Sequence, residues 1–141
     1  MFKVRYDRNG TTYEHIIPAP VQGGFQFMEE RVAKEGSGRN STGEMFIEYI
    51  GSVSQINLKW DILPSTTEYQ RLYRILNALP TFFTFIFPHP NGDSQFEMEC
   101  YNNKINIEGW LFTKKGNYYR GLSTTFTQAN ATAIPVDEAI L

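Results

Sequence analysis

Residues 81–87 read TFFTFIF, and this aromatic run decides the expected fold class. Successive side chains of an extended chain point to opposite faces. One face therefore carries Phe83, Phe85 and Phe87, and the other carries Phe82 and Ile86. A strand that is apolar on both faces needs cover on both, so we expect a central strand here.

Shorter alternating segments lie on both sides of this run. Residues 96–100 alternate Phe, Met and Cys with Glu97 and Glu99, and residues 56–60 alternate Ile, Leu and Trp with polar side chains. This period of two is typical of half-buried strands. Further strands are expected at 2–6, 11–17, 25–32, 45–50, 105–112 and 118–127.

Turn signals separate these strands. Asn9-Gly10 predicts a tight hairpin, because both residue types tolerate positive φ. Gly51-Ser52 predicts a bend or bulge, and Asn102-Asn103 predicts a turn. A further turn is expected at residues 88–93, which read PHPNGD.

One helix is expected at about 65–79. Ser65 and Glu68 match a capping box, with Ser65 as N-cap, and Pro80 ends the segment. Apolar residues recur at spacings of three and four, at Tyr69, Leu72, Tyr73, Leu76 and Leu79. This spacing gives one face that packs on a core, and the two tyrosines also suit a subunit seam, where tyrosine is enriched.

These elements predict a mainly β chain with one α-helix. Strands with turn signals about every 8–12 residues are typical of two packed antiparallel sheets, as a sandwich or a partly open barrel. The helix at about 65–79 would flank them. Composition does not break along the chain, so we expect one domain over residues 1–128, followed by a C-terminal arm over 129–141.

Composition argues against several classes of protein. Of 141 residues, 41% are hydrophobic, and 13 basic against 15 acidic residues give a net charge of −2. Neither a disordered chain nor a basic nucleic-acid wrapper has this balance. One cysteine, Cys100, cannot form an internal disulfide. A signal peptide and a membrane-spanning run of about 20 apolar residues are both absent from the sequence, so we expect no membrane association.

Residues able to do chemistry are scattered. His89 and Asp93 lie in a turn, where an Asx motif explains them better than a cation site does. Glu97 and Glu99 share an exposed strand face, where solubility explains them better than a glycosidase pair. Cys100 alternates with apolar residues and is expected to be buried and inert. No catalytic residue, metal site or cofactor is predicted, and we do not expect an enzyme.

Residues 34–44 contain three glycines and no apolar side chain. A phosphate-binding loop would end in Lys-Ser or Lys-Thr and lead into a helix, and this segment does neither. We interpret it as a long polar loop that docks on a partner, with Arg39 as anchor, because a guanidinium can satisfy two acceptors at once. The expected assembly residues are Gly36, Ser37, Gly38, Arg39, Asn40, Ser41, Thr42 and Gly43.

Residues 129–141 are rich in apolar side chains but have no helical or strand period. Such a segment cannot form its own core, and in solvent it would expose apolar surface. The residues expected to dock on a neighbouring subunit or another protein are Ile134, Pro135, Val136, Ile140 and Leu141. Two alternatives stay open, since the segment could also fold back on its own domain or be disordered.

Three segments together resemble a known family. They are residues 37–45, SGRNSTGEM; residues 58–63, LKWDIL, followed by Thr67-Glu68-Tyr69; and residues 85–92, FIFPHPNG. In this order they are similar to small tail proteins of tailed bacteriophages and prophages of Gram-positive bacteria. The similarity covers roughly residues 1–127.

The resemblance implies the fold shared by tail-tube proteins and the ring domain of distal tail proteins. That fold has two packed antiparallel sheets, one flanking helix and a long loop or hairpin that reaches neighbours, and it assembles as hexameric rings around a DNA channel. A distal tail protein usually carries a second domain, for which 141 residues leave no room. A tube protein, a small tail-tip adaptor or a tail completion protein is therefore favoured.

The expected function is that of a structural protein of the virion tail, synthesised in the cytoplasm of the bacterial host. Its expected partners are copies of itself in stacked homohexameric rings, together with tail proteins such as the tape measure and the baseplate or tail-tip components. DNA would pass through the lumen as a non-specific cargo during ejection.

Two other functions were weighed against this one. In a carbohydrate-binding β-sandwich module of host adsorption, an exposed Trp60 or Trp110 would stack on a sugar. A small β-barrel enzyme would need a cluster of polar residues in a pocket, which the sequence does not indicate.

Overall fold

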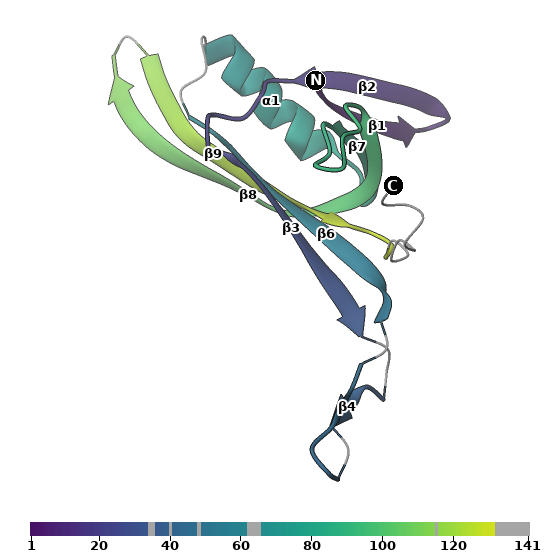
Figure 1. The fold of residues 1–141 in the computed structure, drawn as a ribbon. Coiled ribbons are helices and arrows are strands. Elements are labelled where there is room, and N and C mark those ends of the chain that lie inside the picture. Colours follow the sequence, from purple (N-terminus) through teal and green to yellow (C-terminus); the bar gives the residue numbers. More distant parts are fainter. Residues whose placement is uncertain (34–35, 40, 48, 62–65, 115, 132–141) are drawn as a thin grey trace.

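The structure, a computed structural model, describes residues 1–33, 36–39, 41–47, 49–61, 66–114 and 116–131. It is mainly β with one helix, α1 (Thr66–Ala78), in the described part of the chain (Figure 1). The strands are β1 (Phe2–Arg8), β2 (Thr11–Ile17), β3 (Phe25–Ala33), β4 (Gly38–Arg39), β5 (Met45–Phe46), β6 (Tyr49–Trp60), β7 (Phe83–Phe87), β8 (Phe96–Thr113) and β9 (Gly116–Gln128).

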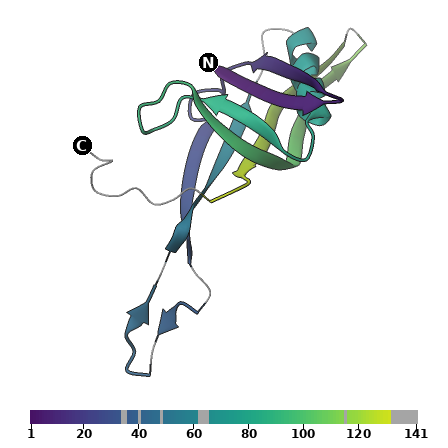
Figure 2. The same cartoon turned by 90° about the vertical axis from the view of Figure 1, so that its right-hand side faces the viewer.

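Seven strands form one antiparallel sheet in the order β2-β1-β7-β8-β9-β6-β3. The sheet curls without closing, so that β7 faces β3 across the core (Figure 2). The rings of Phe25 and Phe27 on β3 lie 6.1 Å and 6.2 Å from that of Phe87 on β7. The predicted class, mainly β and antiparallel with one flanking helix, is confirmed, and of the two expected arrangements the chain adopts the partly open barrel.

Aromatic side chains fill the inside of the curled sheet. Phe83 and Phe85 of β7 both contact Phe126 of β9 edge-on, with ring centroids 4.9 Å and 4.8 Å apart. Burying one such ring contributes roughly 1.5–3 kcal/mol. The predicted central strand is confirmed by its neighbours β1 and β8, but Phe82 precedes the strand and is 54% exposed, so the expected cover over it was wrong.

Helix α1 presents an apolar stripe to this core, as its spacing predicted. The buried side chains are those of Tyr69, Leu72, Ile75 and Leu76. Tyr73 is 40% exposed, so its predicted place on the buried face was wrong, and Ile75 is buried although the prediction did not include it. The predicted N-cap, Ser65, lies outside the described residues.

Both predicted tight turns are confirmed. Asn9 and Gly10 have φ angles of 52° and 80°, the positive values that a two-residue hairpin needs, and they join β1 to β2. In the turn before β8, the amide of Asp93 donates to Oδ1 of Asn91, and the amide of Asn91 donates to Nδ1 of His89. Side-chain acceptors therefore fix this turn, as an Asx motif does.

Two predicted breaks are wrong in their form. Asn102-Asn103 does not turn the chain, because β8 continues through it with a register shift against β9. The bulge predicted at Gly51-Ser52 is present one residue earlier, but it does not separate two strands there, because β6 is continuous. There Val32 pairs with Gly51 and Ala33 pairs with Tyr49, which leaves Ile50 as the extra residue of a β-bulge.

Across the described ranges, no helix combines the length and the apolar character that a bilayer crossing requires.

Candidate assembly surfaces

Strands β3 and β6 run on beyond the rest of the sheet as a two-stranded ribbon. β6 pairs with β9 only from Gln55 onward, whereas its pairing with β3 extends out to Tyr49 opposite Ala33. We call residues 29–54 the distal ribbon. Its tip is the separate β4–β5 hairpin, which stands clear of the curled sheet in both views (Figures 1 and 2).

Polar contacts link the two strands of the distal ribbon and close its hairpin. The Ser52 hydroxyl donates to Oε1 of Glu29 across the two strands at 2.6 Å, and the Arg31 guanidinium lies 5.2 Å from the centre of the Tyr49 ring. In the hairpin, Nη1 of Arg39 donates to the Gly43 carbonyl at 2.9 Å. Arg39 was expected to anchor on a neighbour, but one of its N–H groups closes its own hairpin instead. The guanidinium carries further N–H donors.

The distal ribbon also displays apolar side chains to solvent. Among the described residues, eleven large apolar side chains are exposed, and four of them, Met45, Ile47, Tyr49 and Ile50, belong to the ribbon. A two-stranded ribbon has no second layer under which to bury them. Exposed apolar side chains of this kind make the distal ribbon a candidate interaction surface. The expected strand at 45–50 did not predict this exposure, although its apolar residues do not alternate cleanly with polar ones.

The two edges of the sheet differ. β2 and β3 are its outermost strands. On β2, the Ile16 carbonyl accepts a hydrogen bond from Nη1 of Arg71 on α1 at 3.0 Å, so the helix engages that edge. An edge strand is a template for pairing with another chain unless something covers it.

A shallow groove of about 400 Å³ lies between α1 and β8. Its described lining is Tyr69, Gln70, Tyr73 and Arg74 of the helix with Ile107 of the strand. The tyrosine rings and Ile107 give it an apolar floor, and exposed Arg74 places a cation at its side. The sequence predicted that the two tyrosines could lie at a subunit seam. No pattern in it predicted that Ile107 would lie beside them.

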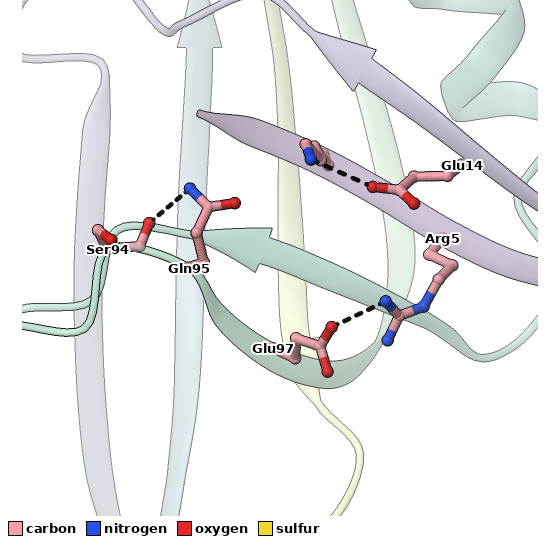
Figure 3. Close-up of polar contacts among 6 residues, drawn as sticks. Arg5, Glu14, Ser94, Gln95 and Glu97 are labelled. Atoms are coloured by element: carbon pink, nitrogen blue, oxygen red, sulfur yellow. Dashed lines mark hydrogen bonds and ion pairs between the residues drawn. The ribbon is translucent and has the colours of Figure 1, made fainter.

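Of the two carboxylates that share a face of β8, Glu97 forms an ion pair within the sheet. Nη1 of Arg5 on β1 donates to Oε1 of Glu97 at 2.8 Å, across β7 (Figure 3). This hydrogen bond is the main cause that lowers the pKa of Glu97 and raises the pKa of Arg5. Lys3 and Glu14 form a second ion pair on β1 and β2, with 3.4 Å between the charged atoms. Glu97 therefore serves as the ion-pair partner of Arg5 on an exposed strand face.

Other candidate residues are also accounted for. Burial raises the pKa of the Cys100 thiol, and the side chain is fully buried beside Phe85, which confirms its expected burial. Trp60 is only 1% exposed, so it does not supply the exposed ring that the carbohydrate-binding alternative requires. The side chain of Trp110 lies outside the described residues. Within the described ranges, no group of three or more His, Cys, Asp or Glu is placed to hold a metal ion.

The structure places only part of the expected assembly residues. Gly36, Ser37, Gly38 and Arg39 with Ser41, Thr42 and Gly43 belong to the hairpin at the tip of the distal ribbon. Asn40 lies outside the described residues, as do the C-terminal positions Ile134, Pro135, Val136, Ile140 and Leu141. The hairpin itself was expected as an irregular loop, and the pairing of Gly38 with Phe46 and of Arg39 with Met45 gives it a short ladder instead.

Comparisons with known proteins add two solved structures. A chain in the tail of an empty gene transfer agent particle, computed with C6 symmetry, aligns with a TM-score of 0.48 and 12% identity, and the alignment covers 94% of each chain. A chain in the virion of a native gene transfer agent particle aligns with a TM-score of 0.48 and 11% identity, over 96% of this chain and 95% of the other. No protein-family model and no curated protein matches the sequence.

Proposed function

We propose that this chain is a structural protein of a phage-type tail, which associates with copies of itself into rings. The observation that carries the proposal is the distal ribbon, a two-stranded projection with exposed Met45, Ile47, Tyr49 and Ile50. In a lone subunit this surface is a liability, and contact with a neighbour would remove it from water. The sequence segments 37–45, 58–63 and 85–92, which resemble small tail proteins, support the same function.

The two sheet edges are unlike, so a contact that uses one of them joins two different surfaces. A contact between the β3 side of one subunit and a different surface of the next is head-to-tail, and such contacts close a ring when the rotation per subunit divides the circle. We propose six subunits, in keeping with the family that the sequence resembles. The ring would belong to the tail tube or to a tail-tip adaptor, would contact tail proteins such as the tape measure, and would let DNA pass through its lumen.

The distal ribbon gives a direct test. Deleting Gly36 to Asn40 should leave the thermal midpoint of the isolated subunit unchanged, because the described residues Gly36 to Arg39 lie beyond the core, and should abolish rings seen by electron microscopy. Ile50→Asp should do the same by placing a charge on the apolar surface. Phe82→Asp is the matched control, since Phe82 is exposed to a similar degree on the body of the protein. Normal rings from both ribbon variants would contradict the proposal.

The segment after β9 gives a second test of the proposed C-terminal arm. Ala129 still belongs to the described body, because its amide donates to the Glu99 carbonyl at 2.9 Å. Truncation after Ala131 should give a folded subunit with an unchanged thermal midpoint that fails to form rings. A lower midpoint would assign the segment to the core of its own subunit instead.

A further inference from the structure

The groove between α1 and β8 has the chemistry of a receptor for a short apolar and acidic peptide. Tyr69, Tyr73 and Ile107 line it with apolar surface, and Arg74 supplies a cation that is exposed to solvent. Its volume of about 400 Å³ suits two or three side chains rather than a whole element. Tyr69 is buried, and partly buried Ile107 packs against the core, so the floor of the groove is continuous with the packed interior.

The chain itself contains one segment of matching chemistry. Residues 134–138 read Ile-Pro-Val-Asp-Glu, which places three apolar side chains directly before two carboxylates. Proline restricts the backbone of such a segment and lowers the entropy lost on docking. Arg74 can pair with Asp137 or Glu138 while Ile134 and Val136 enter the groove.

We propose that residues 134–138 of one copy dock in the α1–β8 groove of a second copy. This inference rests on the self-association proposed above and names one of its contacts.

The geometry of β8 favours a second copy over the same chain. Ala129 is tied to Glu99, and Ile107 lies eight residues further along β8, or on the order of 25 Å at ~3.3 Å per residue. Ile134 lies five residues after Ala129 and can be at most about 17 Å from it when the chain is extended. β9 runs antiparallel to β8, with Gln128 opposite Cys100 and Thr124 opposite Ile105, so the chain leaves β9 in the direction away from Ile107. Ile134 of the same chain therefore falls short of the groove. Figure 1 agrees, since β9 ends on the far side of the sheet from the start of α1.

Charge exchange tests the pairing in the full chain. Arg74→Glu and Asp137→Arg should each weaken self-association at least about fivefold in sedimentation velocity at low salt, and the double variant should restore most of the loss. Lys104→Glu is the matched control, because Lys104 is an exposed cation on β8 outside the groove. Equal association of Arg74→Glu and wild type, or no rescue in the double variant, would overturn the inference.

Disulfide trapping tests which copy donates the segment. A Tyr73→Cys chain mixed with an Ile134→Cys chain should give a disulfide-linked dimer under mild oxidation, because the buried Cys100 does not compete. The same mixture with Phe82→Cys in place of Tyr73→Cys should not. A double variant, Tyr73→Cys with Ile134→Cys, that oxidises within one chain would overturn the assignment to a second copy.

These outcomes separate the inference from the proposed function. If wild type forms rings and the groove variants assemble equally well, the inference alone fails. If wild type stays monomeric at every concentration, both fail.

Discussion

Trp60 donates its indole N–H to the carbonyl oxygen of Pro18, with 2.9 Å between the two atoms. Pro18 begins the segment that carries the chain from β2, at one edge of the sheet, to β3 at the other. The neighbouring Lys59 makes two backbone hydrogen bonds with the same segment. Its carbonyl accepts from the amide of Val21, and its amide donates to the carbonyl of Gly24. The end of β6 thus fixes the crossing segment.

Replacing Trp60 by phenylalanine tests this role. Trp60→Phe leaves the Pro18 carbonyl without its donor in a partly buried site, which should lower the free energy of unfolding by about 1–3 kcal/mol. Urea denaturation followed by circular dichroism measures the loss. Tyr73→Phe is the control, because it also removes one polar group from an aromatic ring but at an exposed position, where a change within about 0.5 kcal/mol is expected. Equal effects would contradict the anchoring role.

Gly24 tests the same segment from the backbone side. A Cβ at Gly24 would lie 2.5 Å from the carbonyl oxygen of Lys59, so Gly24→Ala forces the crossing segment off the end of β6. We expect a loss of about 1–3 kcal/mol, as for overpacking in a core. Gly38→Ala in the hairpin meets no atom within 4 Å and should be nearly neutral. A neutral Gly24→Ala in thermal melts would mean that the segment can move away freely.

The ion pair between Arg5 and Glu97 predicts a pH dependence. Because the pKa of Glu97 is lowered below its ordinary value of 4.5, the folded state holds the proton more weakly than the unfolded state. The stabilisation is therefore fully present above pH 4.5 and is lost as the pH falls through the folded-state pKa. Glu97→Gln should be less stable than wild type at pH 7 in low salt, and the difference should vanish in acid.

The matched control for this dependence is Arg5→Gln. In that background the donor to Glu97 is gone, so adding Glu97→Gln should produce no pH-dependent difference. If the difference in stability between wild type and Glu97→Gln persists unchanged down to pH 2, something other than the ion pair causes it.

Cys100 reports on opening of the core. Burial raises the pKa of its thiol, and the thiolate is the reactive form, so modification by a disulfide reagent at pH 8 should be very slow in the native protein and rapid in urea. Phe82→Cys supplies an exposed thiol on the same fold and should react at once. Fast labelling of Cys100 in buffer would reveal an opening of the sheet that this packing does not provide.

Ser65 tests the start of the helix. It directly precedes Thr66, the first residue of α1, and Ser65→Ala should cost about 1 kcal/mol if it caps the helix. Thr67→Ala, at an exposed position inside the first turn, should be neutral or slightly stabilising. If both variants melt together with wild type, the helix is capped by another residue.

Local patterns predicted the elements whose neighbours lie close in sequence. The hairpin at Asn9-Gly10, the helix face of Leu72 and Leu76, and the alternation of Met98 and Cys100 each follow from a spacing of a few residues. The sheet order and the partly open barrel do not, because they depend on which strands meet across the core.

The Asn102-Asn103 break shows why the remaining predictions failed. Two asparagines indicate a turn by local chemistry, yet Oδ1 of Asn102 accepts from the Thr124 hydroxyl at 2.9 Å and from the Lys104 amide at 3.1 Å. A partner 22 residues away thus stabilises a bulge in place of a turn. The candidate surfaces were missed for a related reason. The exposure of Ile50 depends on the position of β6 relative to its neighbours in the fold. In the same way, the position of β8 decides that Ile107 shares a groove with Tyr73.

The bulge opposite Val32 and Ala33 lies where the distal ribbon leaves the body of the sheet. On its core side, Ile56 and Leu58 of β6 are buried, and β6 pairs with β9 from Gln55 onward. A bulge bends its strand and increases the local twist. The direction in which the β4–β5 hairpin projects is therefore set at Ile50, outside the core. A substitution that removes the bulge should re-aim the hairpin and leave the packing around Leu58 unchanged.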